Sequence, residues 1–388
     1  MNSQEHSKKI FQNYDMIFDR SYYPDFEIHQ GTYIPKDSKP CICLSKEHYE
    51  NCCKSKIEEA INLRKTNPEE ACKKLIDQYN RKNKKLLSFR TEEKSISKKN
   101  ISYCAAQNIF GDCDNHKIRH SHTLAKGNVL KHLKNKGGLI RFNDHIILNE
   151  DKINAKSFDE HFEIVKDNKA SVTVSFCKKH DEELFAHIEK DGNETFKNSI
   201  IQNLEYSLKA ITFEIYYKIM NIKYLSNLVK ENKLVVTKSD GSFNNFFEDY
   251  YNNVEEIFKL YPIMIDLLTD LKNKGVNSQL VTEVFELPVN RINFSLSEVI
   301  EIEGTSCLVN AINCQKPFII ISYYPKEIGK VKFLKAIKSK FEEGSPINNS
   351  HNIFLLWPLT ELLLINAINI YFNKDEFDKL PDEVKGWI

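Results

Sequence analysis

The sequence of 388 residues lacks the features that would place a chain in a membrane or send it out of the cell. Its longest apolar stretch, residues 353–372, is interrupted by a proline, a glutamate and two asparagines, which a membrane-spanning helix tolerates poorly. The first residues are not followed by the apolar segment that a signal peptide needs. We therefore expect a cytoplasmic protein with no membrane partner.

A phosphate-binding loop of the form Gly-x-x-x-x-Gly-Lys-Ser/Thr is also absent, so nothing indicates a P-loop nucleotide hydrolase. Arginine is scarce, with seven arginines against 48 lysines, which indicates an AT-rich genome more than a function. The formal net charge of +1 conceals two basic segments. Residues 79–99 carry eight Lys/Arg and two Glu, and residues 116–141 carry seven Lys/Arg and no acid. Such segments are either solvated helix ends and linkers or surfaces that contact phosphates.

Cysteine, in contrast, is abundant, with ten residues in a chain that shows no sign of secretion. In a reducing compartment this number favours metal binding over a disulfide framework. Cys41, Cys43, Cys52 and Cys53 place four thiols within thirteen residues, the densest cluster in the chain. Four clustered thiolates suit tetrahedral zinc, whereas free thiols so close together are prone to oxidation.

This pattern resembles the SEC-C motif, a small zinc module found on many bacterial proteins. Besides the four cysteines, the residues that carry the resemblance are Ser45 and Tyr49. Leu44 and Lys46 stand where the motif usually has glycine. The resemblance implies a zinc ion held by the four cysteines and a module that docks onto a protein partner.

A second set of candidate ligands lies farther along the chain, in two pairs that are distant in sequence. Cys104 and Cys113 form the first pair, and Cys177 and His180 form the second, at the point where a strand-like segment passes into a helix. Together they satisfy the number and type of ligands that structural zinc requires. Two alternatives remain open here: His116 can replace one ligand, or the cysteines are simply buried small residues.

Between the two pairs lies Arg119-His120-Ser121-His122, in the most basic part of the chain. A cysteine pair, a histidine motif and a closing Cys-x-x-His resemble the HNH nucleases over residues 101–189. The resemblance implies a zinc-held ββα or treble-clef unit in which His122 is the general base. It also implies that His180 or His187 is a helix histidine that binds zinc or a catalytic divalent cation such as Mg²⁺.

The middle asparagine of that family has no counterpart, because Ala170 and Ser171 occupy the corresponding place. His122 has two other interpretations: it caps a helix that begins at Thr123, or it completes the zinc site. Acidic side chains at the start of the closing helix either bind a divalent ion or complement the helix dipole. Candidate phosphate contacts are the basic residues near the histidines, Lys117, Arg119, Lys126 and Lys131.

Periodicity and turn residues predict an α+β fold with a small zinc knuckle, an HNH-like unit, a helical middle and a C-terminal mixed antiparallel sheet with helices. The expected domains are an arm (1–40), the knuckle (41–54), helices with a basic linker (55–100), the HNH-like unit (101–190), a helical region (191–277) and an α+β region (278–388). Helices are expected over 54–64, 68–86, 123–134, 194–229, 243–272, 326–343 and 358–372. Strands are expected over 138–148 (as a pair), 279–287, 293–302, 306–312 and 317–324.

The sequence thus favours a bacterial, zinc-stabilised, HNH-like metal-dependent endonuclease that acts on nucleic acid. The alternative is a non-catalytic zinc-binding protein that binds nucleic acid or a protein partner, and the missing asparagine favours it. A third possibility is that the knuckle is the working part and that residues 104–189 have only a structural role.

Overall fold

The architecture comes from a computed structural model of the chain. It describes residues 3–71, 73, 101–113, 118–125, 129–134, 138–142, 162–189, 196–230, 244–287, 292–302, 304–314, 316–325 and 368–379. The chain divides into two compact units. Unit 1 comprises residues 1–104, 144–155 and 215–261, and unit 2 comprises residues 105–143, 156–214 and 262–388.

Unit 1 holds short N-terminal elements and the four clustered cysteines, Cys41, Cys43, Cys52 and Cys53. It contains α1 (Ser3–Ile10), α2 (Tyr14–Ile17), η1 (Arg20–Tyr22), the hairpin of β1 (Phe26–His29) and β2 (Thr32–Pro35), α3 (Tyr49–Cys52) and α4 (Lys54–Thr66). Parts of the two long helices, α12 (Ile200–Lys230) and α13 (Asn244–Lys272), complete it. Aromatic contacts form much of its core; for example, the rings of Phe18 and Tyr261 stack with their centres 4.3 Å apart.

Unit 2 is built on a seven-stranded antiparallel sheet with the strand order β5-β4-β11-β8-β9-β10-β7. These strands are β4 (Leu139–Phe142), β5 (Phe162–Val165), β7 (Val281–Glu286), β8 (Phe294–Ile302), β9 (Thr305–Ile312), β10 (Phe318–Tyr323) and β11 (Ile370–Asn373). Alternate side chains of these strands form one apolar cluster on a single face. The short helix α16 (Lys374–Asp378) adds Phe377 to that cluster.

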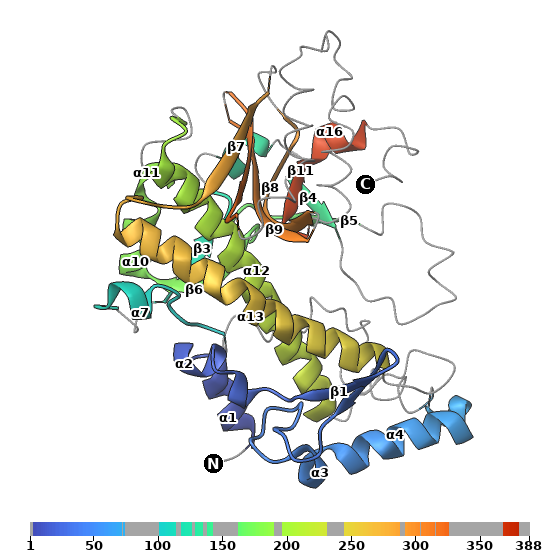
Figure 1. Ribbon diagram of the computed structural model, residues 1–388. Coiled ribbons are helices and arrows are strands. Elements are labelled where there is room, and N and C mark those ends of the chain that lie inside the picture. Colours follow the sequence, from blue (N-terminus) through green and yellow to red (C-terminus); the bar gives the residue numbers. More distant parts are fainter. Residues whose placement is uncertain are drawn as a thin grey trace. The chain divides into compact units, whose positions relative to one another are not determined.

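A separate two-stranded sheet in unit 2 pairs β3 (Ile118–His122) with β6 (Val172–Cys177), with an irregularity between Arg119 and Ser121. Helices α10 (Lys178–Leu184) and α11 (Ala186–Glu189) follow β6 directly, and α7 (Gln107–Phe110) precedes β3. The predicted passage from strand to helix at Cys177 is confirmed. Figure 1 shows β3 and β6 beside α10, so the three elements form a ββα arrangement.

The prediction of a mixed fold with a large antiparallel sheet is confirmed, as are the two long helices and four C-terminal strands. Two predicted helices are wrong over part of their described residues. Ile370–Asn373 is a strand, because these β-branched and aromatic residues lie between β4 and β8 inside the sheet. The helix expected over 123–134 is absent at its start, since Thr123 and Leu124 are held in bends by bonds to Ser171. Among the described residues of this segment, Val129 and Leu130 are π-helical and Lys131–Leu133 is α-helical (α8).

Several predictions concern residues that the structure does not describe. They are the helix over 326–343, the first part of the helix over 358–372, most of the helix over 68–86 and the second strand of the pair over 138–148. The first strand of that pair, β4, joins the large sheet with β5 and β11 as neighbours. None of the described helices is both long and apolar enough to span a bilayer.

Unit 1 contains a buried lysine for which the described residues supply no counter-charge. Lys223 on α12 is 4% exposed, and its ammonium group finds no hydrogen-bond partner among those residues, although it lies over the ring of Phe11 at 5.4 Å. Burial, reinforced by the charges of Lys230 and Lys8, lowers the pKa of Lys223 from 10.5 to about 7. The folded state therefore disfavours the charged amine, and stability should rise with pH between about 7 and 10.5.

We expect Lys223→Met to stabilise the protein at pH 7, by on the order of a few kcal/mol, because it removes a charge that folding must desolvate. The advantage over the wild type should shrink as the pH approaches 10. Thermal unfolding at several pH values measures this difference, with Lys259→Met, an exposed lysine of α13, as the control. A destabilised Lys223→Met protein at pH 7 would contradict the interpretation.

Candidate metal centres

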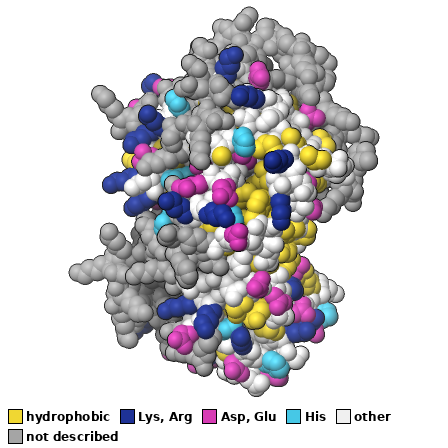
Figure 2. Space-filling view, turned by 90° about the vertical axis from the view of Figure 1, so that its left-hand side faces the viewer, with side chains coloured by type: hydrophobic (Ala, Val, Ile, Leu, Met, Phe, Trp, Pro, Cys, Tyr) yellow, Lys and Arg dark blue, Asp and Glu magenta, His cyan; other side chains and the backbone are white. Residues whose placement is uncertain are grey.

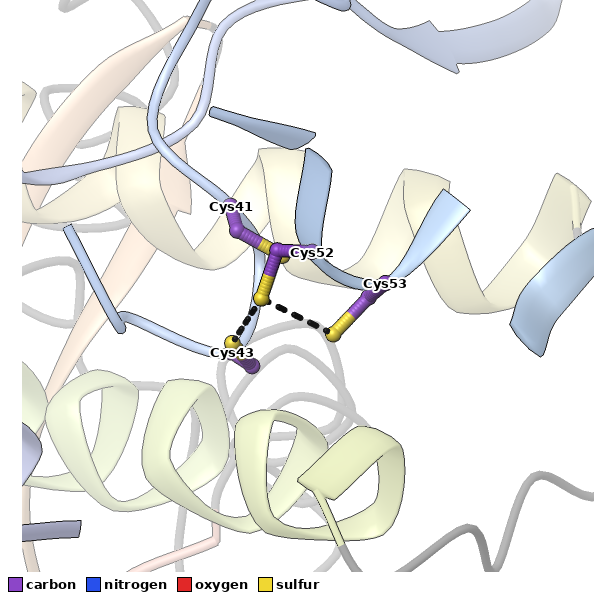
Figure 3. A group of neighbouring side chains, drawn as sticks. All are labelled: Cys41, Cys43, Cys52 and Cys53. Carbon is purple, nitrogen blue, oxygen red and sulfur yellow. Dashed lines mark hydrogen bonds between the residues drawn. The ribbon is translucent and has the colours of Figure 1, made fainter. Parts of the chain in front are cut away.

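The first candidate metal centre, the four-cysteine group, consists of Cys41, Cys43, Cys52 and Cys53. Their sulfur atoms all lie within 4.8 Å of one another, and Figure 3 shows them converging from a turn, from α3 and from Cys53, which lies between α3 and α4. The turn is closed by a hydrogen bond from the Leu44 amide to the Cys41 carbonyl (2.8 Å). The group can therefore hold a tetrahedral metal ion with sulfur ligands alone.

The turn between the cysteines uses the backbone conformation that glycine favours. Leu44 has a φ of 56° and Lys46 a φ of 76°, both in the left-handed region. These are the two positions at which the sequence has side chains in place of the expected glycines. Leu44 is buried, so its packing offsets the strain, whereas Lys46 is exposed and places its ammonium group over the Tyr22 ring at 5.5 Å.

The electrostatics of the four-cysteine group favour a bound cation. Hydrogen bonds from Cys41 and Cys53, and from Ser45 and Cys52, lower the pKa of Cys43. The pKa values of Cys41 and Cys53 are raised, because they share protons with the Cys43 thiolate and are themselves buried. All four thiols can be ionised together only when a metal ion replaces their protons, because four thiolates this close would otherwise repel one another.

The second candidate centre, the cysteine–histidine group, consists of Cys104, Cys113, Cys177 and His180, again with all ligand atoms within 4.8 Å. His180 is 1% exposed, and its Nδ1 lies 3.4 Å from the Cys177 sulfur. Burial lowers the pKa of His180, which keeps the imidazole neutral, as a metal ligand must be. Three sulfurs and one nitrogen match the ligand set of a structural zinc site.

Local contacts bring these four residues together. The Ala105 amide, next to Cys104, donates to the Ser175 carbonyl of β6 (2.8 Å). The chain turns before Cys113 through Gly111 and Asp112, both at positive φ. The Ser121 hydroxyl donates to the buried carboxylate of Asp181, which joins β3 to α10.

His122 belongs to neither group. Its Nδ1 lies 2.8 Å from the Ala170 carbonyl oxygen, which can only accept, so Nδ1 is the donor, and in the neutral ring Nε2 carries the lone pair. Its own carbonyl accepts a hydrogen bond from Lys209 (2.7 Å). No helix begins at Thr123 for it to cap, and it does not complete the zinc site.

The other histidines have distinct surroundings. His180 is a member of the cysteine–histidine group, whereas the half-exposed His187 lies on α11 with its Nδ1 2.6 Å from a carboxylate oxygen of Glu205 on α12. Burial raises the pKa of Glu205 to about 7, although its bonds to His187 and the Ile188 amide act in the opposite direction. His116, the alternative zinc ligand, lies outside the described residues.

The candidate phosphate contacts are described only in part. Lys131 is exposed on α8, the backbone of Arg119 lies in β3, and Lys117 and Lys126 fall outside the described residues. On the face that Figure 2 displays, lysines and arginines are interspersed with acidic side chains. Among the described residues no third cluster of metal-binding side chains is found, so nothing supports a separate Mg²⁺ site there.

Comparison with known proteins adds no relative. No protein-family model matches the chain, and neither a curated protein nor a solved structure matches it.

Two buried charged residues of unit 2, Glu205 and Lys209, escaped the sequence analysis. They lie four residues apart on α12, where the apolar spacing predicts ordinary core packing. The sequence feature that could have identified them is an acid and a base on the apolar face of the helix, next to Leu204 and Leu208.

We expect two zinc ions per chain in protein purified without chelator, measured by elemental analysis. Cys52→Ser should remove one ion and Cys113→Ser the other, because each removes one ligand from a different group. Cys307→Ser is the matched control, since Cys307 is a buried cysteine of β9 outside both groups. Two ions retained in Cys113→Ser would contradict the second site.

The strain at Lys46 gives a second test. Lys46→Gly and Lys46→Ala both lose the contact with Tyr22, but only glycine adopts a φ of 76° without cost. Lys46→Gly should therefore be more stable than Lys46→Ala by about 1 kcal/mol in chemical denaturation of the zinc-loaded protein. Equal stabilities would argue against a left-handed residue in this turn.

Proposed function

We propose that both groups hold structural zinc. The four-cysteine group offers four sulfurs and the cysteine–histidine group three sulfurs and an imidazole, and in each group the ligand atoms lie within 4.8 Å of one another. Four protein ligands complete the tetrahedron, so neither ion would retain a position for water or substrate. What a zinc ion supplies at these sites is folding energy, on the order of 10 kcal/mol.

We further propose that unit 2 cleaves nucleic acid as an HNH-like phosphodiesterase. The observation that carries this proposal is the placement of His122: it ends the first strand of the ββα arrangement, and its Nδ1 donates to the Ala170 carbonyl, which leaves Nε2 as the basic nitrogen of the neutral ring. A neutral imidazole of this kind can take a proton from water as the water attacks phosphorus. Exposed lysines such as Lys131 would bind the phosphates.

The second candidate function is a non-catalytic zinc protein that binds nucleic acid or a protein partner. The specific observation that favours it is at Ala170, where HNH enzymes have a functional side chain and this protein uses only its backbone carbonyl. The absence of a third metal-binding cluster among the described residues favours it as well. In that case the two zinc sites stabilise surfaces for binding, with the knuckle as the site for a protein partner.

The experiment that tests the first proposal is plasmid and RNA cleavage by His122→Ala, with divalent cations supplied. We expect cleavage to fall by about 10²–10⁴-fold, because the general base is lost. Zinc content and nucleic-acid binding should stay unchanged, because His122 belongs to neither metal group.

His132→Ala is the matched control, since His132 is an exposed histidine of the same basic segment. Cleavage retained by His122→Ala would exclude His122 as the base. A wild-type protein that binds nucleic acid but never cleaves it would support the non-catalytic function.

A further inference from the structure

Helix α12 carries two oppositely charged side chains, Glu205 and Lys209, one turn apart in the interior of unit 2. Their side chains are only 1% and 2% exposed. Burying charged groups is costly unless each is paired and hydrogen-bonded. The partners of these two side chains therefore indicate what the pair does.

Glu205 fixes one end of the short helix α11. One carboxylate oxygen lies 2.6 Å from Nδ1 of His187, and the other accepts from the Ile188 amide at 3.0 Å. Nδ1 of His187 donates to this carboxylate, and the bond fixes the orientation of the half-exposed imidazole. Glu205 thus holds α11 by its backbone and orients the ring of His187.

Lys209 joins α11 to strand β3. Its ammonium group lies 2.7 Å from a carboxylate oxygen of Glu189, the last residue of α11, and donates to the His122 carbonyl oxygen at 2.7 Å. It also lies over the Phe185 ring at 4.0 Å, and that ring packs edge-to-face against Phe176 of β6. A single buried cation therefore contacts α11, β3 and the aromatic support of β6.

His122 is consequently held from two sides. The Ala170 carbonyl fixes its ring through Nδ1, and Lys209 fixes its backbone through the carbonyl oxygen. Charge-assisted hydrogen bonds in a buried site are among the strongest that side chains make, so they restrict position effectively. We infer that Lys209 is a positioning residue for His122, and that Glu205, one turn earlier on α12, holds α11 and His187 in the same framework.

The catalytic meaning of this inference rests on the proposed nuclease function, but the positioning itself does not. A displacement of about 1 Å at a reacting group costs on the order of 100-fold in rate. Lys209→Met retains the length of the side chain and its contact with Phe185 while it removes the ammonium group. Lys209→Gln retains a hydrogen-bond donor but removes the charge, and it replaces Lys209→Met in the test if that variant does not fold.

The test compares these variants with Lys272→Met, because Lys272 also donates to a backbone carbonyl, that of Ile109, but at an exposed position. Two readouts report on His122 directly. Long-range proton–nitrogen NMR correlations give its tautomer, and the rate of acylation by diethylpyrocarbonate, followed by peptide mass spectrometry, gives its accessibility. Zinc content and the cleavage rate are measured on the same samples.

We expect Lys209→Met to change the tautomer populations or the acylation rate of His122 and to lower cleavage at least tenfold, with two zinc ions retained. Lys209→Arg should partly restore the His122 signals and the cleavage rate, because it keeps the charge and the hydrogen-bond donors. Unchanged His122 signals in Lys209→Met would overturn the positioning role. Altered His122 signals in a protein whose wild type cleaves nothing would uphold the positioning role and refute the nuclease function.

Discussion

The ββα arrangement depends on one constraint: Cys104 and Cys113 must share a small volume with Cys177 and His180. Two strands alone, β3 and β6, do not make a stable sheet in water. The cysteine–histidine group adds a link between the segment before β3 and the junction of β6 with α10, which are far apart in sequence. Closing such a long loop in the unfolded chain costs entropy, so a bound ion stabilises the closed arrangement.

This constraint separates two tasks that a metal often combines. In both groups all four tetrahedral positions are supplied by protein side chains, so the ions would stabilise the fold and leave the chemistry to other residues. His122 lies next to this framework and is oriented by hydrogen bonds, with the proton on Nδ1. The framework thus accounts for a defined imidazole without requiring it to bind metal.

The sequence predicted the parts of the fold that local patterns determine. The spacing of Cys41, Cys43, Cys52 and Cys53 identified the first group, and the helical periodicity located α12 and α13 to within a few residues at most ends. The assembly of β4, β5 and β11 into the large sheet was not predictable in this way, because it depends on pairing between distant segments. Tertiary packing decided the state of Ile370–Asn373, where a short apolar run is compatible with helix or strand.

The buried pair of Glu205 and Lys209 was missed for a related reason. A charged residue on an apolar helix face has no evident role until its partners, which come from α11 and β3, are known. The left-handed turn at Leu44 and Lys46 is a different case. Its side chains do not indicate a positive φ, and only the resemblance to a motif with glycine at both positions did so. Both cases show that local composition is least informative where distant contacts override it.

Zinc-edge X-ray absorption on the purified protein tests the central claim most directly. The account predicts two zinc ions per chain, one bound by four sulfurs and the other by three sulfurs and one imidazole nitrogen, with no oxygen ligand at either ion. A single zinc with four sulfurs would leave the cysteine–histidine group without its metal. Oxygen ligands at either ion would contradict a closed structural site.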